Sequence, residues 1–490
     1  MNNFFDVIII GFGPTGGTLA SLLAKSNLSI LLLEKEKNLY PLPRAVHFDD
    51  EVMRVFDTIG IKEKFKNYTI INKGTKFVDY KGNVLLDWPR PKEITENGCY
   101  PSYRFHQPDF ERVIRNNLKS YKKFKSIQNA NVKKIINSKD FVKVVFQDTE
   151  TLKINIFKGK YLVGCDGANS ITRKSIKSKF SNLGFTQKWA VIDLILNKKK
   201  NLPDRTIQYS NPKRPATYCR NVGKRRRWEF ALKKNENEKK VLTDKFIWKF
   251  LQPWLKPNEA IIERKVIYTF KSAIANKWRK GRVFIAGDAA HLMPPFMGQG
   301  MCAGIRDVSN LSWKIIHCVK KKHNEKILNS FQKERFSNVK EYIETTMKMG
   351  EFINVMRSYK ISNTISDQSN GSKTMKSIKP ELGPGLGSTL DKNRGRIFPK
   401  FNISKSKSFD ELFSFEPILI VSKKLKLKKM SNKIKIVKES SYKELTKILK
   451  KFNADAILVR PDRFILQTFK KNNSLDNLII TNLKILINLF

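Results

Sequence analysis

The first 35 residues contain the pattern that most restricts how this chain can fold. An apolar run, Asp6–Ile10, leads directly into GFGPTG, which is followed by helical apolar spacing over Thr18–Ala24 and a second apolar run, Ser29–Leu33. Strand, glycine turn, helix and strand in this order are typical of a βαβ unit in a parallel sheet covered on both faces. The sequence therefore predicts an α/β fold that begins with a dinucleotide-binding unit.

The glycines of this turn have the GxGxxG spacing, and each one predicts a separate physical role. Gly11 permits the tight turn, Gly13 lets the backbone approach a pyrophosphate, and Gly16 allows close packing of helix and strand. Glu34 ends the second strand, where an acceptor for ribose hydroxyl groups belongs. The motif does not by itself separate FAD from NAD.

Two further glycine–aspartate turns favour a flavin. YLVGCDGANSITR places Asp166 after a short strand, and RVFIAGDAAHLMPPFMGQGM places Asp288 after another. A carboxylate at the end of a strand can accept hydrogen bonds from ribityl hydroxyl groups, and a helix that starts at Gly298–Gly300 can present N–H groups to an isoalloxazine ring. The three turns, in this order, are difficult to explain as ordinary loops.

This order of motifs resembles the single-component (class A) flavoprotein aromatic hydroxylases, and most closely the 3-(3-hydroxyphenyl)propionate hydroxylase branch. The likeness also includes YPLPRAVHFDDEVMRVFDTIG, NPKRPATY, RRRWEFAL and LVRPDRF, so it runs from about residue 5 to 465. It implies a Rossmann-like FAD-binding domain, an inserted β-rich substrate domain, and a small C-terminal α/β module that is thioredoxin-like but has no CxxC. FAD is the implied bound cofactor.

The resemblance also implies roles for individual residues around FAD. Gly11, Gly13, Gly16 and Glu34 are expected to hold the adenosine half. The residues implied for the rest of the cofactor are Arg44 at the diphosphate, Gln107 and Asp288 at the ribose and ribityl chain, Gly298, Gln299, Gly300 and Met301 at the flavin ring, and Asp166 at both FAD and the reduced nicotinamide.

The implied reaction is the ortho-hydroxylation of a phenolic acid, such as 3-(3-hydroxyphenyl)propionate, in aromatic catabolism. NADH or NADPH and O2 would be the co-substrates, and no second GxGxxG is present to bind the nicotinamide cofactor permanently. The alternative is an FAD-dependent oxidoreductase of the same fold that acts on another substrate without ring hydroxylation. A basic binding protein built on an inactive flavin fold is a third reading, which the intact motifs disfavour.

Candidate catalytic residues are those near the implied pocket that could help to deprotonate a phenol. They are His47, Asp49 and Asp50, although His47 also fits a buried structural histidine and the two acids fit the first turn of a helix. A substrate carboxylate would need an arginine partner. Arg214, Arg225 and Arg227 are the candidates, and the run Arg225–Arg227 also fits an exposed strand edge.

Composition changes along the chain predict five segments. We expect the first part of the FAD-binding domain over 1–185, the β-rich substrate domain over 186–274 and the second part of the FAD-binding domain over 275–355. A connector rich in Gly, Pro, Ser and Lys follows over 356–405, and the shortened thioredoxin-like module occupies 406–490.

The most unusual property of the composition is its charge, 95 Lys+Arg against 44 Asp+Glu, a net charge of +51. Only 23 of the 95 are Arg, the residue that specific readers of nucleic acid favour, so we expect a solvated basic surface and no nucleic-acid partner.

No apolar run is long enough for a membrane helix, and no secretory signal is visible. Five widely spaced Cys and five His predict neither a disulfide framework nor a metal site, which favours a cytoplasmic protein. The sequence is compatible with a homodimer but does not predict the oligomeric state.

Overall fold

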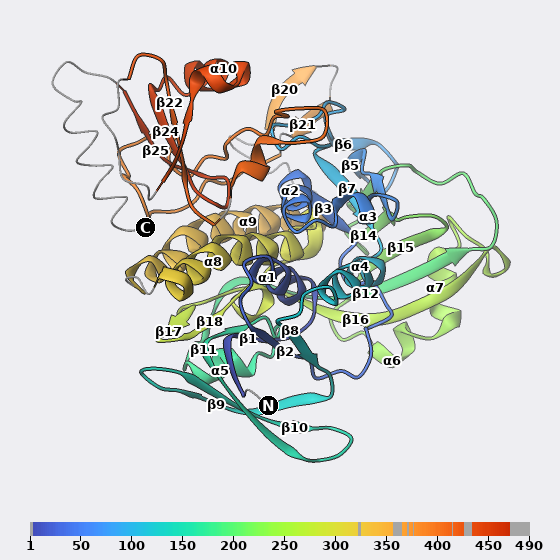
Figure 1. Cartoon of the computed structure of the whole chain (residues 1–490). Helices are drawn as coiled ribbons and strands as arrows, with labels where there is room; N and C mark the ends of the chain where they lie inside the picture. Colours follow the sequence, from blue (N-terminus) through green and yellow to red (C-terminus); the bar gives the residue numbers. More distant parts are fainter. Residues whose placement is uncertain are drawn as a thin grey trace.

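The computed structural model describes residues 3–321, 325–355, 365–369, 372–375, 377–413, 415–425 and 434–470. Within these ranges the chain forms two large sheets and two small ones, with helices packed between them (Figure 1). This confirms the predicted α/β class. The parts of the predicted connector and module at 356–364 and 471–490 lie outside the described residues.

The first large sheet has eight strands and carries the predicted βαβ unit. Its central order is β17-β18-β11-β1-β2-β8, in which β18, β11, β1, β2 and β8 are parallel, and a β9–β10 hairpin extends from β11. The strands are β1 (Phe4–Ile10), β2 (Ile30–Leu33), β8 (Phe124–Ile127), β9 (Ala130–Asn137), β10 (Val142–Asp148), β11 (Ile154–Gly164), β17 (Arg279–Lys280) and β18 (Val283–Ile285).

Helices cover this sheet because its strands are apolar on both faces. β2 is buried at all four positions, and α1 (Pro14–Ala24) packs against α4 (Gln107–Leu118) and α8 (Gly300–Lys321). The helix α9 (Ser330–Val355) runs beside α8 (Figure 1). The short helix α5 (Ile171–Ser175) contacts β11 and β18. The helix α9 has no counterpart among the elements expected from the sequence.

The second large sheet has ten strands in the order β19-β16-β12-β15-β14-β13-β5-β6-β21-β20. Its central strands come from the region expected to be β-rich, but β5 and β6 come from residues 74–89, and β5 pairs in parallel with β13. The strands are β5 (Gly74–Val78), β6 (Val84–Pro89), β12 (Phe180–Leu196), β13 (Thr206–Tyr209), β14 (Ala216–Arg220), β15 (Arg225–Ala231), β16 (Ala260–Ala275), β19 (His291–Leu292), β20 (Ile365–Ser369) and β21 (Ser372–Met375).

Shorter elements join these sheets to the rest of the chain. A three-stranded sheet of order β3-β7-β4 lies at the start of α2. Its elements and the remaining helices are β3 (His47–Asp49), β4 (Thr69–Ile71), β7 (Ser102–Phe105), α2 (Asp50–Thr58), α3 (Lys62–Lys66), α6 (Glu238–Val241) and α7 (Asp244–Leu251).

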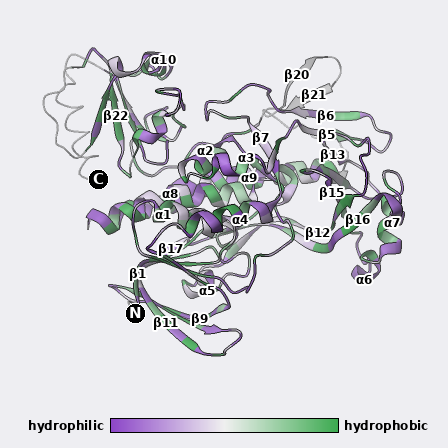
Figure 2. Cartoon of the chain, turned by 45° about the vertical axis from the view of Figure 1, so that its right-hand side comes forward, coloured by the Kyte–Doolittle hydropathy of each residue, from purple (hydrophilic) through white to green (hydrophobic). Residues whose placement is uncertain are grey.

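In its described residues the C-terminal module contains a four-stranded sheet and one α-helix, and it packs over α8 and α9 (Figure 1). Hydrophobic residues dominate the strands around β22 (Figure 2), because this sheet has its own core against α10. The elements are β22 (Ile418–Val421), β23 (Lys435–Lys438), α10 (Lys443–Lys451), β24 (Ala456–Val459) and β25 (Ile465–Phe469). Its thioredoxin likeness stays a prediction.

Buried ion pairs attach this module to the rest of the molecule. Arg460 contacts Glu334 of α9 at 3.0 Å, and Glu334 also pairs with Lys314 of α8 at 2.7 Å. A second contact joins Arg54 of α2 to Asp410 through two hydrogen bonds of 2.7 Å. Arg460 belongs to the LVRPDRF segment, whose conspicuous charges therefore hold the module in place.

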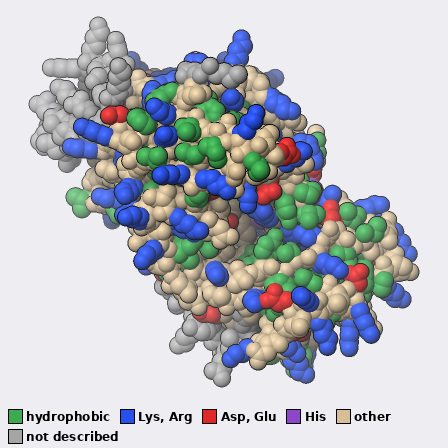
Figure 3. All heavy atoms as spheres, turned by 90° about the horizontal axis from the view of Figure 1, so that it is seen from below, with side chains coloured by type: hydrophobic (Ala, Val, Ile, Leu, Met, Phe, Trp, Pro, Cys, Tyr) green, Lys and Arg blue, Asp and Glu red, His purple; other side chains and the backbone are tan. Residues whose placement is uncertain are grey.

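The basic side chains are dispersed over the surface. Figure 3 shows Lys and Arg spread across one face among other residue types, with no single basic patch. This distribution agrees with the expectation of a solvated basic surface. Within the described ranges, no helix has the length and hydropathy needed to cross a membrane.

Candidate active site

The three glycine turns meet at one edge of the parallel sheet. Ile10 of β1 pairs with Gly164 of β11, and Gly164 pairs with Ile285 of β18. Because these neighbouring strands run in the same direction, their carboxyl ends deliver Gly11, Cys165–Asp166 and Gly287–Asp288 side by side. Ligands of open α/β sheets bind at this edge.

The backbone of the first turn has the form that a diphosphate requires. A Cβ on Gly11 (φ +100°) would overlap the carbonyl oxygen of Cys165, and a Cβ on Gly16 would overlap that of Gly11. A Cβ on Gly13, by contrast, would meet no atom within 4 Å. Gly13 precedes the first turn of α1, where no side chain caps the free N–H groups. The turn is thus tightly packed at Gly11 and Gly16 but has free space at Gly13, and this space suits an anion bound at a helix N-terminus.

Glu34 lies beside this opening. Its Oε2 accepts a hydrogen bond from the Phe12 N–H at 2.6 Å, and its Oε1 accepts one from the Glu36 N–H at 3.0 Å. The half-buried carboxylate is therefore fixed in orientation, and its remaining lone pairs are available to ribose hydroxyl groups.

Gln107 holds the PRA segment in place. Its Oε1 accepts hydrogen bonds from the backbone N–H groups of Arg44 (3.1 Å) and Ala45 (2.7 Å), and its Nε2 donates to Glu111 at 2.7 Å. The Arg44 guanidinium is exposed and lies over the Tyr40 ring, 4.7 Å from its centre. Gln107 thus orients a backbone segment, and Arg44 presents a free positive charge.

The two aspartates of the later turns differ in their bonding. Asp166 accepts hydrogen bonds from Ser170 Oγ (2.6 Å) and from the N–H and Oγ1 of Thr172 (both 3.0 Å), so it is bonded to the first turn of α5, whose N-cap is Ser170. The Asp288 carboxylate has no hydrogen bond to any described residue. Asp288 is exposed at this edge. Asp288 is therefore the carboxylate that is available to a ligand at this edge.

A buried network supports the Asp288 turn, and no sequence motif indicates it. Asp307 of α8 accepts hydrogen bonds from the Gly287 N–H (3.0 Å) and from Arg335 Nε (2.9 Å), and it pairs with His291 Nε2 at 2.6 Å. These contacts hold the turn against α8 and α9. The partners are too far apart in the sequence for a local pattern to indicate them.

The GQGM segment packs directly on His47. Gly298 has φ +65°, and a Cβ there would come within 2.8 Å of the His47 ring. His47 Nδ1 lies 3.1 Å from the Gly298 carbonyl oxygen and its Nε2 lies 2.7 Å from Ser102 Oγ. Asn72 Nδ2 donates to the same Oγ at 2.8 Å, so Ser102 donates to Nε2 and Nδ1 carries the proton. Burial, with the charges of Arg104 and Arg90, lowers the pKa of His47 to about 3, which leaves the ring neutral.

Asp49 joins the GQGM segment to α2. It caps α2 by accepting from the Val52 N–H (3.2 Å), and it accepts further bonds from Gln299 Nε2 (3.2 Å) and Arg306 (2.5 Å). Burial alone would raise the pKa of Asp49, but the Arg306 charge and hydrogen bond hold it below its ordinary value. Asp50 is held by Asn97 at 3.0 Å and Lys379 at 3.3 Å. Both acids are thus engaged in ion pairs.

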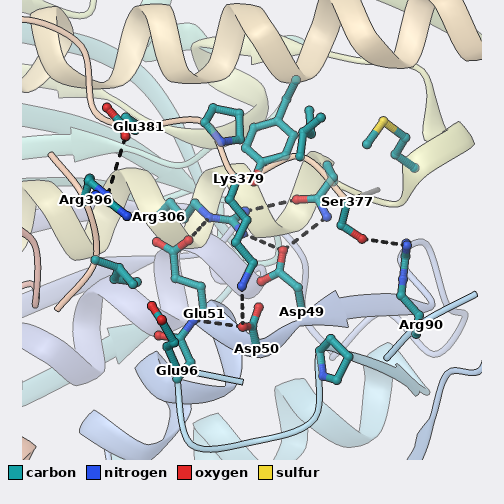
Figure 4. A pocket seen from close by; sticks show the side chains of 18 of the residues that line it. Asp49, Asp50, Glu51, Arg90, Glu96, Arg306, Ser377, Lys379, Glu381 and Arg396 are labelled. Carbon is teal, nitrogen blue, oxygen red and sulfur yellow. Dashed lines mark hydrogen bonds and ion pairs between the residues drawn. The ribbon is translucent and has the colours of Figure 1, made fainter. Parts of the chain in front are cut away.

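A cavity of about 290 Å³ lies against these residues (Figure 4). His47, Met297 and Gln299 form one wall, and Trp88 and Arg90, at the end of β6, form another. Met297 and Trp88 belong to a hydrophobic cluster that continues behind the cavity with Trp189 and Phe296, whose rings are 5.5 Å apart. The volume suits a single-ring ligand, and the aromatic backing limits the access of water.

The arginines expected to bind a substrate carboxylate lie elsewhere. Arg214 pairs with Glu236 at 2.6 Å, Arg225 with Glu263 at 3.3 Å and Arg227 with Asp193 at 2.7 Å, and none of the three lines this cavity. Arg227 also donates to the carbonyl oxygens of Pro43 (2.7 Å) and Arg44 (2.9 Å). It thereby connects β15 to the PRA segment.

Sequence reasoning missed three residues of this site: Trp88, Arg90 and Arg306. Arg306 is one of many charged residues on a long helix, and its partner Asp49 is 257 positions away. The only local signal for the other two is an aromatic residue and an arginine in the sequence WPR. No group of three or more metal-ligating side chains occurs in the part of the chain that the structure describes.

A family model and two similar proteins indicate the same family for this chain. The model of the FAD binding domain family matches residues 5–346. The chain is 33% identical over 417 residues to a probable NADH-specific resorcinol 4-hydroxylase from Rhodococcus jostii, a match that covers 83% of this chain and 77% of the relative. A 3-(3-hydroxy-phenyl)propionate/3-hydroxycinnamic acid hydroxylase from Mycolicibacterium gilvum is 30% identical over 349 residues. That match covers 71% of this chain but only 60% of the relative.

Solved structures show the same fold at low sequence identity. Aklavinone-11 hydroxylase, solved with FAD and aklavinone, aligns over 100% of both chains with a TM-score of 0.78 and 15% identity. The p-nitrophenol 4-monooxygenase from Pseudomonas putida aligns with 73% of this chain and 91% of its own, with a TM-score of 0.67 and 20% identity.

Proposed function

The chain belongs to the FAD-binding family of the class A flavoprotein aromatic hydroxylases, and from this premise we propose that it hydroxylates a phenolic ring with NADH and O2. The observation that carries the proposal is the position of the cavity. Its wall includes Gln299, which belongs to the segment expected to border the flavin ring, and Met297, which directly precedes that segment. A small aromatic substrate in this cavity would therefore lie next to the cofactor.

The residues at the sheet edge fit FAD. The open face of Gly13 and the uncapped start of α1 suit a diphosphate, with Arg44 as a nearby cation. Asp288 offers an unbonded carboxylate to ribityl hydroxyl groups, and Glu34 offers one to the ribose. When bound and reduced by NADH, the flavin would supply the activation of O2 for ring hydroxylation. The choice of NADH follows the name of the Rhodococcus relative.

The protein's own contribution is to hold the ring. His47 is a neutral imidazole in the cavity wall, and its hydrogen bond to Ser102 connects the cavity to Asn72. Both of its ring nitrogens are engaged, by Gly298 and Ser102, and Asp49 and Asp50 are held in ion pairs. We therefore assign these three side chains a positioning role in the cavity wall.

The test is turnover by the FAD-loaded protein with a panel of phenols and phenolic acids. We expect substrate-stimulated NADH oxidation and a product that carries one oxygen atom from ¹⁸O2, detected by mass spectrometry. NADH oxidation that yields only peroxide with every compound, with no labelled product, would refute the hydroxylase assignment.

A further inference from the structure

The side chain of Arg90 is an uncompensated cation in the wall of the candidate substrate cavity. Its guanidinium carbon lies 3.9 Å from the centre of a Trp88 ring, and its NH1 donates to Ser377 Oγ at 2.9 Å. No carboxylate of a described residue lies within 4.0 Å of it. Figure 4 shows Arg90 and Ser377 together at one side of the cavity, apart from the acids around Arg306.

The other charges at the cavity are already balanced. Arg306 contacts both Asp49 (2.5 Å) and Glu51 (2.6 Å), and Lys379 contacts Asp50 at 3.3 Å. The remaining lining pairs are Arg396 with Glu381 at 3.9 Å, and Glu96 with Lys451. Among the described cations that line this cavity, Arg90 is thus the one whose charge has no acidic partner.

The surroundings of Arg90 favour an anion. Burial and the positive charges of Arg104 and Arg205 lower the pKa of Arg90 to about 9, although the charges of Asp49 and Asp50 oppose the shift. The guanidinium stays charged at neutral pH, and an anionic ligand would stabilise this charge. Trp88 is only 2% exposed, and its Nε1–H has no hydrogen-bond partner in the described structure.

The position of Arg90 also fits a substrate that reaches His47. Both residues line the same cavity, and the charge of Arg90 contributes to the lowered pKa of the His47 ring. A phenol near His47 and a carboxylate on Arg90 would therefore be held at two points of one small cavity. The contact with the Trp88 ring and the hydrogen bond to Ser377 restrain the guanidinium, whose remaining N–H groups can bind a carboxylate.

We propose that Arg90 binds the carboxylate of a phenolic acid, so that the cavity selects anionic phenols over neutral ones. This inference rests on the proposed function, since it assumes that the cavity holds the ring to be hydroxylated. It extends that function by assigning the substrate's charge and the residue that recognises it.

The test compares 3-(3-hydroxyphenyl)propionate with its neutral amide, which has the same ring and chain. Equilibrium dialysis with the FAD-loaded protein would give a Kd for each, and turnover would give each kcat/KM. The wild-type protein should bind the acid roughly ten- to hundredfold more tightly than the amide, as expected of a charge-assisted hydrogen bond. Arg90→Gln should remove most of that preference, and Arg90→Lys should keep part of it.

The matched control is Arg220→Gln. Arg220 is a partly exposed arginine of the same ten-stranded sheet that pairs with Asp204 at 3.3 Å and does not line the cavity. It should leave both Kd values unchanged, and flavin content and far-UV circular dichroism would verify that each variant is folded.

Two results would overturn the inference: equal binding of acid and amide by the wild-type protein, or an acid preference that survives in Arg90→Gln. Failure of the proposed function has a different signature. In that case neither compound is hydroxylated, while the dialysis still reports whether Arg90 recognises a carboxylate.

Discussion

The carboxylate of Asp49 and the guanidinium of Arg306 lie 2.5 Å apart and join the start of α2 to α8. Gln299 completes the contact, since it donates to Asp49 at 3.2 Å and accepts from Arg306 at 3.1 Å. The three side chains fix the GQGM segment against the helix that follows His47. The acids of the DDE sequence therefore shape the cavity wall through ion pairs.

Removal of Arg306 should be strongly destabilising. Arg306→Met leaves Asp49 and Glu51 buried or half-buried without their cation, and we expect the free energy of unfolding to fall by about 3–5 kcal/mol. Urea unfolding measures the loss. Lys340→Met, which removes a cation from an exposed pair with Glu344, should cost about 0.5 kcal/mol or less. Equal losses in the two variants would contradict the structural role of Arg306.

Gly13 and Gly16 should respond differently to the same substitution. Gly16→Ala forces a Cβ onto the Gly11 carbonyl and should lower the unfolding temperature of the apoprotein by several degrees or prevent folding. Gly13→Val has room and should leave the apoprotein stable while weakening FAD binding. Scanning calorimetry of the apoprotein and titration with FAD separate the two effects. An unchanged affinity for FAD in Gly13→Val would count against a diphosphate at this turn.

Asp288 and Asp166 form a second informative pair. Asp288→Asn should weaken FAD binding by roughly tenfold, because a hydrogen bond to a charged acceptor becomes one to a neutral amide. Asp166→Asn should instead cost about 1 kcal/mol of stability, because Asp166 accepts the Thr172 N–H in the first turn of α5. Flavin retention after gel filtration and thermal unfolding report on the two properties. The assignment of Asp288 fails if that variant retains its flavin fully.

Acid should loosen the attachment of the C-terminal module through Glu334. Burial would raise the pKa of Glu334, but Arg460 and Lys314 lower it to about 2, below its ordinary value of 4.5. A depressed carboxyl pKa contributes stability above the ordinary value, and this contribution is lost as pH falls from about 4.5 toward 2. It is on the order of 3 kcal/mol for a shift of this size.

The measurement for Glu334 is the free energy of unfolding between pH 6 and pH 3. Glu334→Gln should be less stable at pH 6 but should show a shallower decline toward pH 3 than the wild-type protein. Glu344→Gln, an exposed carboxyl on the same helix, should keep the wild-type slope. Parallel curves for Glu334→Gln and the wild-type protein would show that Glu334 does not titrate in this way.

The sequence was sufficient for features whose causes are local. The apolar strands and the GxGxxG turn follow from period, spacing and turn chemistry within a few residues. The edge that gathers Gly11 and Asp288 was also predictable, because parallel strands place their carboxyl ends together. The individual roles assigned to the cofactor-binding residues stay predictions.

What the sequence could not predict depends on contacts between distant segments. β5 joins the substrate sheet by pairing with β13 across more than a hundred residues, and nothing in the GTKFV sequence specifies that partner. In the sequence alone, Arg90 cannot be told from a surface arginine. Its place at the cavity depends on the end of β6 and on Ser377, which is distant in the sequence. The helix α9 was overlooked because its polar and apolar residues do not separate into a clear stripe.

The cavity acquires its last wall from the end of the chain. Phe464 and Ile397 line it and form a β-bridge with each other, whereas the turns at Gly11, Asp166 and Asp288, with the Asp307 and Arg335 that support the last of them, lie within the first 335 residues. At about 5–20 residues per second, the ribosome adds the intervening residues in on the order of ten seconds. During that interval the nascent chain contains the residues of the nucleotide-binding edge but not those that close the cavity, so synthesis itself separates the capacity to hold a cofactor from the capacity to enclose a substrate.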